Sequence, residues 1–207
     1  MTNLSAKKLE EVSEKTLHHY GINPSGFWQG TKDHDVSQNY QALLNALPKN
    51  KSLDLLDFGC GPGRDLFYFK SLGHRPIGLE GCASFCQMAR NYSACEVWQQ
   101  DFLHLNLPAE KFDGVFANAS LFHIPSQELI RVLKQLWTAL KPEGVLFSSN
   151  PRGDEEGWQG ERYCHFMELE DYEQFLEKAG FKIEDHYCRP PGKPLSQQPW
   201  LAVVSRK

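Results

Sequence analysis

Three glycines at alternate positions follow a short apolar stretch in the first third of the chain. Residues 53–58 form the apolar stretch, and Gly59, Gly61 and Gly63 come directly after it, before a helical pattern that begins at Arg64. Glycine adopts backbone conformations that are closed to other residues and lets a ligand approach the main chain. Because ligands bind beyond the carboxyl ends of strands in open α/β sheets, the pattern predicts a strand, a ligand-binding turn and a helix.

The rest of the chain alternates between apolar stretches and helical patterns. We expect strands at 53–58, 76–79, 96–99, 112–117, 145–149, 181–187 and 200–205. We expect helices at 4–20, 64–72, 83–90, 129–140 and 170–179, turns at 21–33, and a helix capped within 33–37 that ends at Leu47. Strands separated by helices predict a mostly parallel sheet with helices on both faces. The last two strands have no helix between them, so they are expected to pair antiparallel at an edge.

Length and charge limit the organisation and the partners. The 207 residues, 41% of them hydrophobic, suit one compact domain with an extension. We place an N-terminal helical lid at 1–48 and the ligand-binding core at 49–207. The net charge of −4 disfavours nucleic acid as a partner, because proteins that bind it are usually basic.

The remaining compositional signals concern location. The apolar run 200–204 is far shorter than the roughly 20 residues of a membrane helix, and residues 1–11 are too charged for a signal peptide. Six cysteines form no CxxC pair, which is typical of free thiols in a reducing compartment. We therefore expect a cytoplasmic protein with no membrane partner.

The glycine turn allows two cofactor interpretations. A dinucleotide-binding turn requires a third glycine where this chain has Arg64, which is too large for that close packing. The stretch from Asp57 to Gly63, D-x-G-x-G-x-G, instead resembles the first motif of class I S-adenosylmethionine (SAM) methyltransferases. That resemblance implies a Rossmann-like α/β fold with a seven-stranded, mostly parallel sheet, one antiparallel edge strand and an N-terminal helical lid. It also implies SAM as the cofactor and S-adenosylhomocysteine as its product.

Later residues fit the same family. Glu80 ends the second expected strand, where one carboxylate can accept from both ribose hydroxyls; the alternative is a helix N-terminal acid. Asp101 and Phe102 resemble the residues that meet the adenine amine and ring. Asn118 ends the fourth expected strand at the place that faces the methyl group, without the Asn-Pro-Pro-Tyr motif of base and glutamine methylases. The expected cofactor-binding residues are Asp57, Gly59, Cys60, Gly61, Gly63, Glu80, Gly81, Asp101, Phe102, Asn118 and Trp28.

Substrate recognition is expected to lie outside this scaffold. The stretch 26–39 carries Phe27 and Trp28 and then an Asp-His-Asp cluster, and we interpret it as a lid; the alternatives are a core anchor and helix caps. The candidate catalytic residues are His34, Asp33, Tyr20, Asn118 and His123, although a single histidine such as the last is often structural. The candidate substrate-binding residues are Asn150, Arg152 and Arg162, because arginine suits carboxylates and surface charge is the alternative. No histidine motif supports a metal site.

A narrower resemblance covers nearly the whole chain. The stretches 28–39, 56–66, 95–102, 147–153 and 197–201 resemble the methyltransferase domain of ovothiol biosynthesis. That family methylates an imidazole nitrogen of 5-thiohistidine and gives ovothiol A, and in many members the domain follows an iron-dependent sulfoxide synthase. The printed sequence lacks the synthase's iron-binding histidine motif. The resemblance thus implies only the last step, with the upstream synthase acting separately.

The chemistry of that substrate indicates a base. An imidazole nitrogen is nucleophilic only when its lone pair is free, and histidine titrates near neutral pH. Our hypothesis is that His34, oriented by Asp33 or Asp35, or alternatively Tyr20, removes the proton. The alternatives to this function are a methyltransferase for another small-molecule nucleophile, a NAD-dependent oxidoreductase and an inactive SAM-binding partner subunit.

Overall fold

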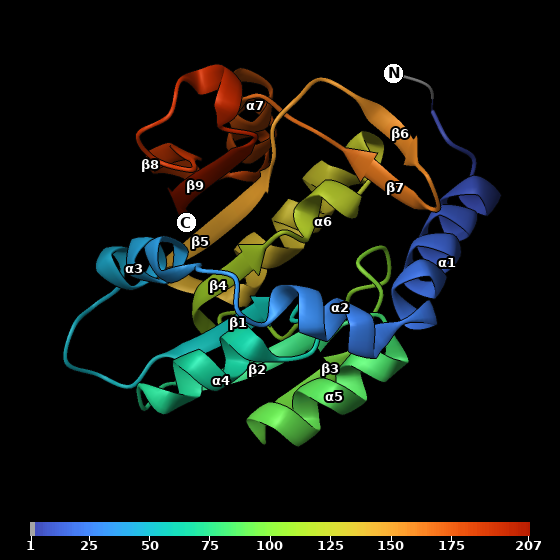
Figure 1. The fold of residues 1–207 in the computed structure, drawn as a ribbon. Coiled ribbons are helices and arrows are strands. Elements are labelled where there is room, and N and C mark those ends of the chain that lie inside the picture. Colours follow the sequence, from blue (N-terminus) through green and yellow to red (C-terminus); the bar gives the residue numbers. More distant parts are fainter. Residues whose placement is uncertain (1–2) are drawn as a thin grey trace.

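A computed structural model describes residues 3–207 (Figure 1). Its helices are α1 (Ala6–Ile22), α2 (Pro24–Thr31), α3 (Ser37–Ala46), α4 (Arg64–Ser71), α5 (Ala83–Ser93), α6 (Ser126–Ala139) and α7 (Leu169–Ala179), with 3-10 turns η1 (Leu121–His123) and η2 (Leu195–Gln197). Its strands are β1 (Asp54–Phe58), β2 (Arg75–Glu80), β3 (Glu96–Gln99), β4 (Phe112–Asn118), β5 (Leu140–Pro151), β6 (Glu156–Gln159), β7 (Arg162–His165), β8 (Lys182–Arg189) and β9 (Trp200–Arg206).

The main sheet of this described region has seven strands in the order β3-β2-β1-β4-β5-β9-β8. The first five strands in this order are parallel, and β9 runs antiparallel to both β5 and the edge strand β8. The chain moves outward from β1 to β3 and then returns to the other side of β1 with β4. That reversal opens the crevice beyond the carboxyl ends of β1 and β4, where ligands of such folds bind. The predicted α/β architecture is confirmed.

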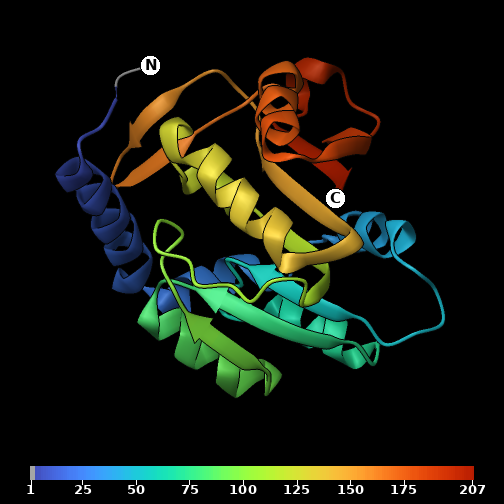
Figure 2. The same ribbon diagram turned by 180° about the vertical axis from the view of Figure 1, so that it is seen from behind.

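The core lies on both faces of the sheet, because neighbouring residues of a strand point to opposite sides. Leu55 and Phe116 face α3, and Leu56 and Val115 face α6 and α7. Strands covered on both faces read as continuous apolar runs, which is why they were recognisable in the sequence. Figure 2 shows α6 on the side opposite α3 and α4.

Two elements differ from the prediction. The segment 21–33, expected to form turns, contains α2, which starts with Pro24 and is capped by Asn23, whose side chain accepts from the Gly26 N–H at 2.9 Å. The hairpin β6–β7 was not predicted, and it pairs Trp158 with Tyr163 across the strands. Helix α1 lies beside this hairpin in both views, so the expected lid region meets an element that is distant in sequence (Figures 1 and 2).

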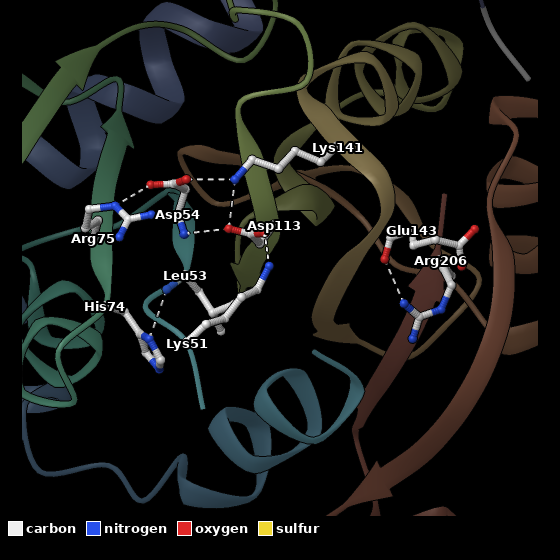
Figure 3. A network of polar contacts seen from close by, with 9 residues as sticks. All are labelled: Lys51, Leu53, Asp54, His74, Arg75, Asp113, Lys141, Glu143 and Arg206. Atoms are coloured by element: carbon white, nitrogen blue, oxygen red, sulfur yellow. Dashed lines mark hydrogen bonds and ion pairs between the residues drawn. The ribbon is translucent and has the colours of Figure 1, made fainter. Parts of the chain in front are cut away.

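The amino ends of β1 and β4 carry an ion-pair network (Figure 3). Lys141 bridges Asp54 at 2.7 Å and Asp113 at 3.0 Å, and Arg75 and Lys51 each pair with one of these carboxylates. The network lies at the end of the sheet opposite the ligand crevice. Along residues 3–207, no helix combines the length and apolar character needed to cross a bilayer.

Candidate functional site

The glycine turn after β1 is fixed by its own packing. Gly59, Gly61 and Gly63 all have positive φ, at 79°, 50° and 97°. A Cβ on Gly59 would lie 2.5 Å from the Ser120 Cβ, and one on Gly63 would lie 2.7 Å from the Ala89 Cα. A Cβ on Gly61 would meet only the Phe27 ring, at 3.9 Å. The first and third glycines therefore let the turn pack against the segment after β4 and against α5, and the second faces open space.

Glu80 joins the turn to β2. Its Oε2 accepts from the Gly61 N–H at 3.0 Å, and its Oε1 accepts from the Cys82 N–H at 2.7 Å. Burial raises the pKa of Glu80, and these backbone hydrogen bonds counteract the increase. Each carboxylate oxygen has a second lone pair. The side chain can therefore accept two further donors from a ligand without losing its own partners.

The smaller of two adjoining cavities, about 100 Å³, lies above Glu80 and the glycine turn. Ser13 and Tyr20 of α1, Phe27 of α2 and Phe85 of α5 form its wall, and Asp101 and Phe102 close the β3 side. The Asp101 carboxylate accepts from the Leu103 N–H at 2.8 Å and from the Ser13 hydroxyl. The cavity therefore offers two carboxylates among aromatic rings.

These residues fit SAM. A carboxylate with free lone pairs at the end of β2 suits the two ribose hydroxyls, and a carboxylate after β3 suits the adenine amine. Asp57, at the base of the turn, is buried, and its Oδ2 has no hydrogen-bond partner among residues 3–207. Burial and the nearby Asp65 charge raise the pKa of Asp57. Gly81 lines the smaller cavity, Cys60 lines the larger one, and Gly63 serves the packing of the turn.

The larger cavity, about 780 Å³, adjoins the smaller one, because Phe27, Gly59, Gly61 and Ala119 line both. Its other walls come from the segment between α2 and α3, from the start of α4 and from the ends of β4, β5 and β8. Trp28, His34, Asp35, Arg64, Asp65, Asn118, Arg189 and Trp200 are among its lining residues. This cavity combines aromatic surfaces with charges of both signs.

A hydrogen-bond network fixes Asn118 at the floor of the larger cavity. Its Nδ2 donates to Asp65 at 3.4 Å, and its Oδ1 accepts from Asn39 Nδ2 at 2.9 Å. Asp65 also accepts from Arg64 Nε at 2.7 Å and from the Tyr40 hydroxyl. Burial and the Asp65 charge raise the pKa of Tyr40, so its hydroxyl stays a donor. The amide of Asn118 is therefore oriented by Asp65, in the cavity wall, and by Asn39, behind it.

Tyr20, His123 and Arg162 meet although they are distant in sequence. His123 Nδ1 lies 2.8 Å from the Tyr163 carbonyl oxygen, so Nδ1 carries the proton and Nε2 accepts from the Tyr20 hydroxyl at 2.8 Å. Arg162 Nη1 donates to the same hydroxyl at 3.3 Å. Burial lowers the pKa of His123 to about 4, so the ring is neutral at neutral pH. Burial raises the pKa of Tyr20.

Six expected site residues line neither cavity: Asp33, Asp57, Gly63, Asn150, Arg152 and Arg162. Three of them are engaged elsewhere or point to solvent. Arg152 pairs with Glu168 at 3.0 Å and donates to main-chain oxygens, and the Asn150 Oδ1 accepts from the Phe122 N–H at 3.2 Å. Asp33 has an 86% exposed side chain and lies 3.7 Å from Lys32. In this structure Asn150 and Arg152 are thus engaged with other parts of the chain, and Asp33 points to solvent beside Lys32; the roles expected for these three residues stay predictions.

Sequence reasoning missed Asp65 and Arg189. Asp65 directly follows the glycine turn, so its place next to a ligand-binding motif was the available signal. Arg189 offered none, because it comes from the far end of the chain and reaches the cavity only through the pairing of β8 with β9. In the described part of the chain, no group of three or more His, Cys, Asp or Glu side chains is arranged to hold a metal ion.

Known proteins are similar to this chain in sequence and in structure. A family model described as "Methyltransferase domain" matches residues 56–148. The sterol 24-C-methyltransferase of Candida albicans is 23% identical over 96% of this chain and 61% of its own length. The trans-aconitate 2-methyltransferase of Azoarcus sp. is 31% identical over 55% of this chain and 45% of its own length. The chain thus spans about three fifths or less of these curated relatives.

Solved structures share the fold. The 1,6-didemethyltoxoflavin-N1-methyltransferase of Burkholderia thailandensis, solved with 1,6-didemethyltoxoflavin and S-adenosylhomocysteine, has a TM-score of 0.76 and 20% identity over 100% of this chain and 92% of that one. A SAM-dependent methyltransferase from Leishmania major has a TM-score of 0.79 and 18% identity over 93% of this chain and 82% of that one.

The solved structures and the matched model identify the fold of this chain. The chain has the class I SAM-dependent methyltransferase fold. The methyltransferase-domain model matches its residues from Leu56 in β1 to Ser148 in β5, which include the glycine turn, Glu80, Asp101 and Asn118.

Proposed function

We propose that this domain transfers the methyl group of SAM to an imidazole nitrogen of 5-thiohistidine and releases ovothiol A and S-adenosylhomocysteine. One observation carries the proposal. The stretch 28–39, which resembles the ovothiol methyltransferase domain, contributes Trp28, His34 and Asp35 to the wall of the larger cavity. This part of the resemblance therefore lies beside the cavity proposed for the cofactor.

The proposal agrees with the chemistry of a structural neighbour. The Burkholderia thailandensis protein is an N1-methyltransferase solved with a small molecule, so methyl transfer to nitrogen is compatible with this fold. SAM supplies an electrophilic methyl group on a sulfonium when it is bound. In our proposal Glu80 holds the ribose, Asp101 holds the adenine amine, and Asn118 and Asp57 lie toward the amino-acid part.

The chain's own residues contribute position and desolvation. Phe27 lies between the two cavities, and Phe85 packs on it with ring centroids 4.9 Å apart. Such a wall keeps water from the junction, and methyl transfer gains most of its rate from alignment in a dry site. The network of Asn39, Asp65 and Asn118 fixes the floor of the acceptor cavity in one orientation.

We assign the role of general base to His34. Its side chain lines the larger cavity and makes no hydrogen bond to another described residue, so its ring is available to a ligand. In the thiolate–imidazolium form of 5-thiohistidine, a ring nitrogen must lose its proton to expose a lone pair, and a neutral histidine can take that proton. Tyr20, which lines the smaller cavity, is the second candidate, because it can take the proton on its hydroxyl oxygen while it passes its own proton to Nε2 of the neutral His123.

The direct test is one incubation. Purified protein with SAM and 5-thiohistidine is expected to give a singly methylated product by mass spectrometry, and histidine serves as the parallel control. No product, with SAM binding shown in the same sample, would contradict the 5-thiohistidine proposal. Trans-aconitate in a further sample tests the second candidate, a methyltransferase for another small nucleophile, which the Azoarcus relative favours.

Kinetics of single variants distinguish the two candidate bases, His34 and Tyr20. His34→Ala is expected to lower kcat by about 10²–10⁴-fold, the usual contribution of a general base. Asp33→Asn is the matched control from the next position, and it is expected to leave kcat unchanged because Asp33 points to solvent. A wild-type rate for both His34→Ala and Tyr20→Phe would remove the base from the mechanism.

A further inference from the structure

The two arginines of the larger cavity differ in their partners. Arg64 donates twice to the Asp65 carboxylate, at 2.7 and 3.1 Å, and once to the Thr31 carbonyl oxygen at 2.9 Å. Arg189 makes one hydrogen bond, from Nη2 to the main-chain oxygen of Asp35 at 2.8 Å. No carboxylate among residues 3–207 lies within ion-pair distance of Arg189.

The free donors of Arg189 require a partner. A guanidinium has five N–H groups in a rigid fork, and its strongest partner is a carboxylate or phosphate bound through two parallel hydrogen bonds. Arg189 is half-buried at the cavity wall, where its remaining donors meet little protein. A ligand anion in the cavity would complete this set of hydrogen bonds.

The position of Arg189 favours the methyl acceptor over the cofactor. β8 is separated from β1 by β4, β5 and β9, which at about 4.8 Å per strand spacing places them roughly 19 Å apart. The glycine turn, Glu80 and Asp101 all lie on the β1–β3 side. Tyr187 fixes the end of β8 over the cavity floor, because its hydroxyl donates to Asn39 Oδ1 at 2.9 Å.

A carboxylate of opposite charge lies on the same wall. Asp35 lines the larger cavity, and its Oδ1 accepts from the Ser37 N–H at 2.9 Å. The hydrogen bonds from Ser37, and to a smaller extent the Arg189 charge, lower the pKa of Asp35, so the carboxylate is ionised at neutral pH. One wall thus offers a cation with free donors next to an anion with free lone pairs.

We propose that Arg189 binds the carboxylate of an α-amino-acid methyl acceptor and that Asp35 binds its ammonium group. The inference rests on the proposed function and adds the residues that select the substrate. The imidazole then extends from this wall toward the junction of the two cavities, where Phe27 and Ala119 lie. Arg152 and Arg162, the arginines expected from the sequence, have no part in it.

Calorimetry on the protein saturated with S-adenosylhomocysteine tests the inference. Arg189→Gln is expected to weaken 5-thiohistidine binding about 30- to 100-fold, the usual cost of losing a bidentate ion pair. The affinity of Arg189→Lys for 5-thiohistidine is expected to lie between those of wild type and Arg189→Gln, because lysine keeps the charge and lacks the two parallel N–H donors of arginine. Lys193→Gln removes an exposed charge from the following loop as the control. 5-Thiohistamine, which lacks the carboxylate, is expected to bind wild type and Arg189→Gln equally.

A second variant tests Asp35. Asp35→Asn keeps an oxygen for the Ser37 N–H and removes the charge, so that hydrogen bond survives. We expect this variant to bind 5-thiohistidine more weakly than wild type does. We expect both proteins to bind the desamino analogue of 5-thiohistidine, which keeps the carboxylate, with equal affinity. Equal binding of 5-thiohistidine by Asp35→Asn and wild type would remove Asp35 from the site.

The outcomes separate this inference from the proposed function. Turnover of 5-thiohistidine by wild type with unchanged binding by Arg189→Gln would overturn the inference and leave the function standing. An equal loss of S-adenosylhomocysteine affinity in Arg189→Gln would assign this side chain to the cofactor and also overturn the inference. If wild type neither binds nor methylates 5-thiohistidine, both proposals fail.

Discussion

At the scale of single residues, the site depends on carboxylates whose partners are main-chain N–H groups. Glu80 is held by the amides of Gly61 and Cys82, so its position follows from the backbone rather than from other side chains. Asp101 depends partly on Ser13 of α1, which is a different element. The two carboxylates should therefore differ in their contribution to cofactor binding.

We expect Glu80→Ala to weaken SAM binding more than Asp101→Ala does. In our proposal Glu80 loses two charge-assisted hydrogen bonds at about 1.5–3 kcal/mol each, and Asp101 loses one. The expected losses are about 10²-fold or more for Glu80→Ala and about 10-fold for Asp101→Ala, measured by calorimetry. The opposite order would contradict the ribose assignment. Glu170→Ala, on exposed α7 surface, controls for the loss of one acidic residue.

The sequence predicts some residues of the candidate site and not others. Glu80 and Asp101 follow strands at positions that a family motif makes recognisable. Arg189 and Asp65 could not be predicted as cavity residues, because their role depends on which neighbours the fold brings to them. Asp33 and His34 are adjacent in sequence and point differently, since only the latter lines the cavity.

At the scale of elements, the glycine turn has the strictest local requirement. Gly63 combines a φ of 97° with contact to the Ala89 main chain, whereas Gly73 has a φ of 83° and open space where a Cβ would lie. The two glycines share the backbone strain and differ in crowding. They therefore form a matched pair for mutation.

We expect Gly63→Ala to lower the free energy of unfolding more than Gly73→Ala does. Both variants incur the cost of a left-handed alanine, about 1 kcal/mol or more. The first also pushes a methyl group into α5, which adds about 1–3 kcal/mol. Urea unfolding of both variants measures the difference. Equal losses would show that the turn has room at Gly63 and that its close packing is not required.

Helix α2 and the hairpin β6–β7 show why some elements escape sequence prediction. α2 has eight residues, two of them glycines, and local propensity alone does not favour it. It forms where Asn23 and Pro24 start it and where Phe27 packs on Tyr20 and Phe85. The hairpin is held partly through Thr16 of α1, whose hydroxyl accepts from the Tyr163 N–H at 3.1 Å. Both depend on distant contacts.

At the scale of the whole molecule, the two ends of the sheet differ in what they carry. The carboxyl ends of β1, β2 and β4 carry the cavities, and the amino ends of β1 and β4 carry the ion-pair network of Figure 3. The parallel topology produced this division, and it was predictable from the alternation of strands and helices. The strand order and the single reversal at β1 place the glycine turn, Glu80 and Asn118, and the N-terminal segment adds Tyr20 and His34.

The ion-pair network predicts a dependence of stability on pH. Hydrogen bonds from Arg75 and Lys141 lower the pKa of Asp54 from 3.8 to about 2. A carboxylate with a lowered pKa adds stability above its ordinary pKa, and the gain is lost as the pH falls through about 2. Lys141→Met should therefore cost about 1 kcal/mol at pH 7, because the pairs are partly exposed, and less near pH 2.

Chemical denaturation at the two pH values checks this expectation. Lys134→Met, which removes a lysine with no ion pair in the described structure, serves as the control. A cost of Lys141→Met that stays constant from pH 7 to pH 2 would show that the Lys141 side chain contributes packing rather than charge.

The central claim is that the cofactor lies on the glycine turn and that the larger cavity holds the methyl acceptor. A crystal structure with S-adenosylhomocysteine and 5-thiohistidine tests both parts in one measurement. We predict the ribose hydroxyls on Glu80, the imidazole of the ligand within reach of His34, and its carboxylate on Arg189. A 5-thiohistidine bound outside the cavity of His34 and Arg189, or a ribose away from Glu80, would contradict the account.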